Sequence, residues 1–111
     1  MRADSDPSRY NDPVFQVRRH FRCGWTRIAV TGQLDISTAL TFRRRLRAFR
    51  TADTPIYLDL SQVDFMDSMG ACAVLDAVAA SRDSTWRLEV ELPLSRQARR
   101  CLDLTKTAGR Y

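Results

Sequence analysis

The amino-terminal half of the chain has the hydrophobic pattern of two strands followed by a helix. Aromatic and β-branched residues predict a first strand at Val14–Phe21, and regular alternation predicts a second at Thr26–Thr31. Residues 23–25, Cys-Gly-Trp, have the composition of a hairpin turn, and we expect Gly32 to end the second strand. Apolar residues then recur at helical spacing over Thr38–Arg50, which predicts an amphipathic helix.

The carboxyl-terminal half continues this alternation. A short run with few charges predicts a central strand covered on both faces, followed by a loop. The next segment is small and apolar, as expected of a helix that packs closely on a sheet. Clean alternation then predicts another strand, ended by Pro93. The bounds are Pro55–Leu60 for the strand, Ser61–Phe65 for the loop, Ser68–Ser81 for the helix, Trp86–Leu92 for the next strand and Arg96–Leu104 for a last helix capped by Ser95.

The order of elements, ββαβαβα, predicts a single α/β domain. Strands separated by helices are parallel through right-handed crossovers, so the sheet should be mostly parallel, with the first two strands as an antiparallel edge. A length of 111 residues fits one domain. We expect residues 1–12, which are polar, to form a mobile leader and residues 13–111 to form the domain.

Three acids have structural interpretations. Asp35, or Ser37 beside it, can cap the first helix, and Asp67 can cap the second. Asp59 lies in the short apolar strand, where a carboxylate needs a partner, and we expect an arginine or a backbone group to supply it.

Two stretches resemble the signature of the STAS domain (sulfate transporter and anti-sigma factor antagonist). The first is VTGQLD at residues 30–35, and the second is LDLSQVDFMDSMG at residues 58–70, in front of a helix of small residues. The resemblance covers about residues 14–104 and implies a STAS-like fold. It also implies a cytoplasmic bacterial regulator that binds an anti-sigma factor, often a serine kinase, and so releases the sigma factor.

In this family, the kinase phosphorylates the hydroxyl residue immediately before the glycine, and phosphorylation ends binding. Here the residue before Gly70 is Met69, which has no hydroxyl. Ser68 is one residue earlier, and one residue on a helix is a rotation of about 100°. Three interpretations stay open: an antagonist that is always competent to bind, a kinase that uses Ser68, and a divergent STAS module for another protein or a small anionic ligand.

By resemblance, the partner-binding or switch residues are Asp35, Asp67, Ser68, Met69 and Gly70. Capping alone would also explain Asp35 and Asp67. Met69 is flexible and polarizable, which suits an adaptable apolar contact in place of the switch.

A basic helix face is the main argument for a different class of function. The net charge is +5, and the first helix carries Arg43, Arg44, Arg45, Arg47 and Arg50. This face can dock an acidic partner or bind nucleic acid. It has no interleaved aromatic residues for stacking on bases and no accompanying nucleic-acid-binding motif, so we favour the protein partner.

The sequence offers no constellation for catalysis, a metal or a cofactor. Cys23, Cys72 and Cys101 are far apart and form no CxxC pair, which favours reduced and mostly buried thiols. His20 is the only histidine, and we expect it at the surface or half-buried. We therefore predict no enzyme, metal or cofactor. The longest nearly apolar run, residues 69–80, contains Asp76 and is too short to span a membrane. A STAS subunit of a larger sensory or transport assembly is a further alternative.

Overall fold

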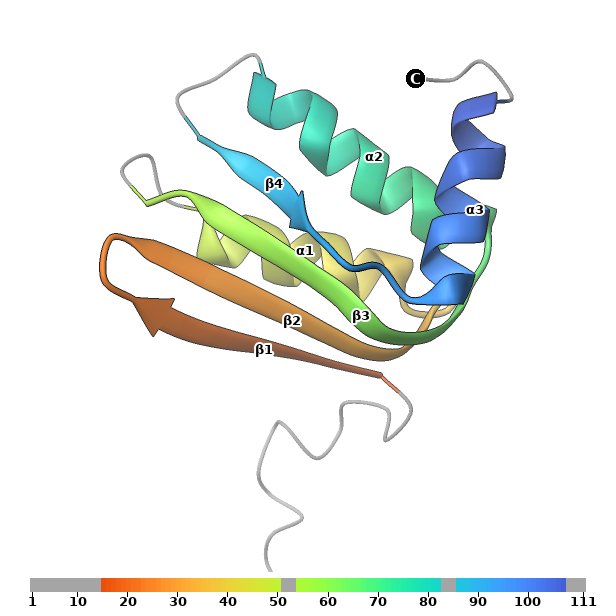
Figure 1. Ribbon diagram of the computed structural model, residues 1–111, viewed down its shortest axis with the longest axis horizontal. Helices are drawn as coiled ribbons and strands as arrows, with labels where there is room; N and C mark the ends of the chain where they lie inside the picture. Colours follow the sequence, from red (N-terminus) through yellow and green to blue (C-terminus); the bar gives the residue numbers. More distant parts are fainter. Residues whose placement is uncertain (1–14, 51–53, 83–85, 108–111) are drawn as a thin grey trace, which may run out of the picture.

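The computed structural model describes residues 15–50, 54–82 and 86–107, and it contains the predicted order of elements (Figure 1). The leader expected at residues 1–12 lies outside the described residues. The elements are β1 (Phe15–Arg22), β2 (Trp25–Leu34), α1 (Ala39–Phe49), β3 (Ile56–Met66), α2 (Ser68–Arg82), β4 (Leu88–Glu91) and α3 (Arg96–Thr107).

The four strands form one mixed sheet in the order β1-β2-β3-β4. β1 is antiparallel to β2, whereas β3 pairs parallel with both β2 and β4. Val17 lies opposite Val30, and Ile28 lies opposite Leu58. The predicted α/β fold, with a mostly parallel sheet and an antiparallel edge, is confirmed.

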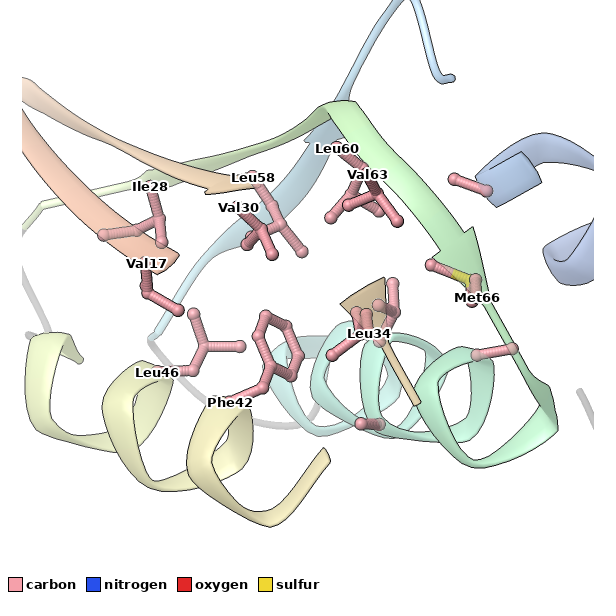
Figure 2. Packing of buried hydrophobic residues seen from close by; sticks show 14 of the residues in the cluster. Val17, Ile28, Val30, Leu34, Phe42, Leu46, Leu58, Leu60, Val63 and Met66 are labelled. Carbon is pink, nitrogen blue, oxygen red and sulfur yellow. The ribbon is translucent and has the colours of Figure 1, made fainter. Parts of the chain in front are cut away.

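The core lies between one face of the sheet and the helices. Figure 2 shows Val30, Leu58 and Leu60 directed from the sheet toward Phe42 and Leu46 of α1. The prediction that the third strand is covered on both faces is wrong. Its buried residues alternate with Tyr57 and Asp59, which are only half-buried. The run Pro55–Leu60 therefore has period two, and its polar positions lie on the face opposite the core.

β2 and β3 both extend further than the sequence predicts. Gly32 does not end β2, which continues to Leu34, and the expected loop at Ser61–Phe65 is the second half of β3. Pairing continues to Leu34 and Met66, with register shifts on either side of Thr31 and Gly32. The positive φ of Gly32, 94°, belongs to this irregularity. The glycine thus bends a continuing strand, and hydrogen bonds to the neighbouring strand override the local turn signal.

The remaining boundaries differ by a few residues. β4 is shorter than the predicted strand, and Trp25 belongs to β2 and not to the turn. α2 and α3 each extend slightly beyond the predicted end. The predicted cap of α3 is confirmed, because the Ser95 hydroxyl oxygen accepts the Ala98 N–H at 3.1 Å.

Candidate functional site

The turn between β3 and α2 is built around Asp67, which caps α2 as predicted. Its Oδ1 accepts the backbone N–H of Gly70 at 3.0 Å. Its carbonyl oxygen accepts the N–H of Ala71 at 2.9 Å. These bonds satisfy the Gly70 N–H, one of the amides that the start of a helix leaves without an intrahelical partner, and close the first turn of the helix.

Asp67 also joins this turn to the segment after β2, a link that sequence reasoning did not find. Its Oδ2 accepts the N–H of Ile36 at 3.0 Å, and its own N–H donates to the Leu34 carbonyl at 3.3 Å. One carboxylate therefore holds the start of α2 against residues 34–36. The two sequence motifs, 30–35 and 58–70, meet at this point.

Gly70 permits the close approach of these two segments. A Cβ atom at this position would overlap the backbone carbonyl oxygen of Leu34. Gly70 is buried, and any side chain would push α2 away from the end of β2. The glycine of the second motif is thus a packing requirement, independent of any role in partner binding.

Asp35 organises the turn that leads into α1. Its Oδ1 accepts the Ser37 N–H at 2.9 Å and the Ser37 hydroxyl at 2.6 Å. In return, the Thr38 hydroxyl oxygen accepts the Asp35 N–H at 3.0 Å. The bonds from Ser37 are the main reason why the pKa of Asp35 is lowered, since they favour the charged carboxylate.

The predicted cap of α1 is corrected by this geometry. The N-cap residue is Thr38, without a side-chain capping bond, and not Asp35 or Ser37. Asp35 acts one turn earlier, where its carbonyl oxygen accepts the N–H groups of Thr38 and Ala39. The turn at residues 35–38 therefore precedes the regular helix instead of starting it.

Ser68 and Met69 are the first two residues of α2, and both are exposed. Met69 is 44% exposed although it is a large apolar residue. Because α2 is otherwise buried over most of its first two turns, these two side chains are the part of the helix start that a partner can reach.

Four exposed apolar side chains, called the apolar patch below, come from the segments that adjoin the start of α2 and from α1. Ile36 is held beside this helix start by Asp67, and Leu40 lies about one helical turn before Arg43, which lines the same groove as Met69. The exposed fractions are 71%, 57%, 44% and 62% for Ile36, Leu40, Met69 and Leu104, respectively. Met69 and Leu104 also line an open groove of about 590 Å³ between α2 and α3, with Arg43 and Asp76 on its rim. Sequence reasoning missed Leu40 and Leu104. Their only signal is that each is a leucine off the apolar stripe of its helix.

The basic face of α1 is smaller than the sequence suggests. Arg43 forms an ion pair with Asp76 of α2 at 2.9 Å, and the Arg50 guanidinium lies 5.0 Å from the ring centre of Trp86. Arg44 and Arg47 are exposed, and Arg45 is half-buried. Arg44 and Arg47 are thus the arginines of this face most open to a partner.

Asp59, His20 and Cys23 lie outside this candidate site, whereas Cys72 and Cys101 line the groove beside Met69. Asp59 accepts the Ser61 N–H at 2.9 Å, which confirms the expected backbone partner, and His20 is exposed as predicted. The three cysteines are free, but Cys23 is exposed at the hairpin tip, contrary to the expectation of mostly buried thiols. Cys72 is buried and Cys101 is half-buried, and burial raises the pKa of the Cys101 thiol.

The described ranges contain neither a candidate metal site nor a helix that could cross a membrane. In residues 15–50, 54–82 and 86–107, no three histidine, cysteine or acidic side chains gather in a way that could hold a metal ion. No helix within these ranges has the length and apolar character to cross a membrane.

Comparison with known proteins identifies the family of the chain. Residues 16–106 match the family described as "Mlab, STAS domain". A search of curated proteins returned no match.

Solved structures share the fold. An anti-sigma factor antagonist from Mycobacterium paratuberculosis is 25% identical over 90% of this chain and 86% of its own, with a TM-score of 0.60. The anti-sigma factor antagonist SpoIIAA in its unphosphorylated form is 19% identical over 86% of this chain and 83% of its own, with a TM-score of 0.62.

A larger protein also contains this fold. The crystal structure of Mglu is 24% identical over 70% of this chain, with a TM-score of 0.58, and the match spans only 19% of that protein. The family match covers nearly all of the described residues, and the strand order and the Asp67–Gly70 turn agree with the sequence motifs. This chain therefore belongs to the STAS domain family.

Proposed function

We propose that this protein acts as an anti-sigma factor antagonist in the bacterial cytoplasm, by docking to an anti-sigma factor of the serine kinase type and without catalysis. The observation that carries the proposal is the exposed Met69 at the start of α2, inside the apolar patch. Large exposed apolar side chains that gather on one side of a protein mark interaction sites. The likeness to the Mycobacterium paratuberculosis antagonist, which covers 90% of this chain and 86% of that one, supports the choice of partner.

The docking surface consists of the apolar patch, the rigid turn beneath it and the basic residues beside it. Asp35 and Asp67 hold the turn through backbone hydrogen bonds, and Gly70 lets α2 lie against it. Arg44 and Arg47 lie along α1 beyond Leu40. A complementary partner has an apolar centre and an acidic rim.

Met69 makes this antagonist unresponsive to the kinase at the usual position. A phosphate at the start of a helix would add about −1.5 to −2 charges to the centre of a docking surface. Methionine has no hydroxyl to phosphorylate, so the surface stays apolar. The activity of such a protein is controlled through its abundance.

The test is capture of the anti-sigma factor from lysate of the source bacterium, with and without ATP, followed by the intact mass of the captured protein. Wild type should retain an anti-sigma factor and gain no phosphate. Met69→Asp should lose the partner, because a carboxylate would be buried without a counterion. Phe21→Asp is the matched control, since Phe21 is 66% exposed on β1, outside the patch.

Each other result would contradict part of the proposal. Phosphate on Ser68 with release of the partner would show that the switch has moved by one residue. Equal capture by wild type and Met69→Asp would remove Met69 from the interface. If no anti-sigma factor is captured, the sigma-regulating function is wrong, although the fold stands.

A second candidate is a STAS module that docks within a larger assembly. The observation in its favour is that the fold makes up about a fifth of the Mglu structure. The same apolar patch would then contact a different polypeptide. Capture of a protein other than an anti-sigma factor, lost in Met69→Asp and kept in Phe21→Asp, would support this candidate.

A further inference from the structure

A cleft between α1 and α2 has a basic rim. It encloses about 220 Å³, and both helices lie on the same face of the sheet (Figure 1). Arg43, Arg47 and Arg50 line the cleft, and their spacing places them on one side of α1. Among the described residues that line the cleft, Asp76 of α2 is the only acidic one. Three guanidinium groups against one carboxylate give the cleft a net positive charge.

Two of these arginines are oriented by contacts that use few of their hydrogen-bond donors. Arg43 donates one N–H to Asp76 Oδ2 at 2.9 Å. The Arg50 guanidinium lies 5.0 Å from the ring centre of Trp86, which is a cation–π contact and not a hydrogen bond. Because a guanidinium carries five N–H donors, both contacts hold the group in place and leave donors that a ligand can use.

The floor of the cleft is apolar. Trp86, which comes shortly before β4, is buried there, and small side chains of α2 leave the space open. The apolar lining residues are Leu46, Ala73, Ala77, Ala80 and Trp86. A closed cavity of about 150 Å³ holds one benzene ring. A cleft of about 220 Å³ therefore admits one aromatic ring together with a carboxylate group.

We propose that this cleft binds a small aromatic carboxylate, with the ring on the apolar floor and the carboxylate at the arginine rim. Planar guanidinium groups bind carboxylates through two parallel N–H···O bonds. A small anion without a ring would gain nothing from the floor, and an uncharged ring would gain nothing from the arginines. The two halves of the cleft thus select a ligand that carries both groups.

The cleft adjoins the proposed docking surface but is a separate site. Arg43 and Asp76 line both the cleft and the groove beside Met69, so their ion pair lies between the two. Binding of the carboxylate is measured on the purified protein and does not depend on an anti-sigma factor. Failure of either proposal therefore leaves the other standing.

The test is titration of the full chain with sodium benzoate at constant ionic strength, followed by tryptophan fluorescence in the Trp25→Phe variant. Trp25 and Trp86 are the only tryptophans, so the signal of this variant comes from the cleft. Benzoate should bind with a dissociation constant of roughly 0.1–10 mM, as expected for so small a ligand. Acetate and benzyl alcohol, which each carry one half of the ligand, should bind at least about 10-fold more weakly.

Two variants test the rim and the floor separately. Arg47→Gln should weaken benzoate binding by roughly 5- to 20-fold, because it removes a charged donor. Ala80→Leu should also weaken binding, since a larger side chain at this exposed lining position fills the cleft without changing its charge. Arg99→Gln is the matched control, because it removes the same charge from an exposed position on α3, and it should bind benzoate like wild type. Thermal unfolding of each variant checks that the fold is retained.

Three results would overturn the proposal. One is the absence of benzoate binding up to about 30 mM. Another is equal binding of acetate, inorganic phosphate and benzoate, which would show a contact of arginines with any anion and no aromatic site. The third is equal weakening in Arg47→Gln and Arg99→Gln, which would show a response to net charge and not to the cleft.

Discussion

Single residues at the start of α2 have structural roles that precede any role in partner binding. Asp67 uses both carboxylate oxygens, one for the helix cap and one for the segment after β2. Gly70 has no side chain, and a Cβ atom at this position would separate the start of α2 from the end of β2. The geometry that presents Met69 therefore depends on two neighbours that the partner need not touch.

Gly70→Ala should destabilise the protein by about 2–3 kcal/mol through overpacking against the Leu34 backbone, which cannot rotate away. Glycine to alanine in an ordinary helix interior changes stability in the opposite direction, by about 1 kcal/mol. Urea unfolding measures the sign. Ser68→Ala is the control, because an exposed residue should change stability by less than about 0.5 kcal/mol. A stabilised Gly70→Ala protein would show that the close approach is absent in solution.

The lowered pKa of Asp35 predicts a dependence of stability on pH. The folded carboxylate binds its proton less readily than the unfolded one, so its bonds with Ser37 stabilise the fold above the ordinary pKa of 3.8. That contribution should disappear as the pH falls through the lowered value. The difference in unfolding free energy between wild type and Asp35→Asn should therefore shrink below about pH 4. A difference that is constant from neutral to acid pH would contradict this assignment.

At the scale of whole elements, local sequence patterns predicted the buried face of a helix but not the length of a strand. The helical spacing of Ala39, Phe42, Leu46 and Phe49 predicted the inward face of α1. The first three are buried, and Phe49 is half-buried. The length of β3 was not predictable, because Ser61, Gln62 and Asp64 are polar and this segment is held in the sheet by pairing with β2. Strand pairing is a long-range effect, and no local propensity encodes it.

Two residues of α1 separate stability from binding. Phe42 is fully buried, and Phe42→Ala should destabilise the fold by about 3–4 kcal/mol. Leu40→Ala should change stability little, because Leu40 is 57% exposed, but it should weaken binding of the captured anti-sigma factor. Thermal unfolding and a binding titration on the same samples check both results. Unchanged binding by Leu40→Ala would restrict the docking surface to α2 and α3.

At the scale of the whole molecule, basic and acidic side chains gather on different elements. Arg44 and Arg47 lie on α1, on the side of the proposed docking surface, whereas Glu89 and Glu91 lie on β4. Arg27 of β2 spans β3 to hydrogen-bond Glu91 at 3.0 and 2.8 Å, and this contact raises the pKa of Arg27. The net charge of +5 therefore does not describe any one face.

The double variant Arg44→Glu, Arg47→Glu should slow association with the anti-sigma factor, and the effect should diminish as salt is added. Stability should change little, because both side chains are exposed. Binding of wild type to a single-stranded oligonucleotide is the comparison. Strong, steeply salt-dependent oligonucleotide binding that the same variant abolishes would favour a nucleic-acid function for this face.

The sequence by itself determined the order of the elements, the mixed sheet, the capping roles of Asp67 and Ser95, and the family. Each of these depends on residues close together in the chain, through periodicity, turn chemistry or a contiguous motif. Only the tertiary structure decided that Asp67 holds Ile36, that Arg43 and Arg50 are engaged within the fold, and that Leu104 lines the same groove as Met69. These relations join residues from different elements, and their geometry follows from how the helices pack on the sheet.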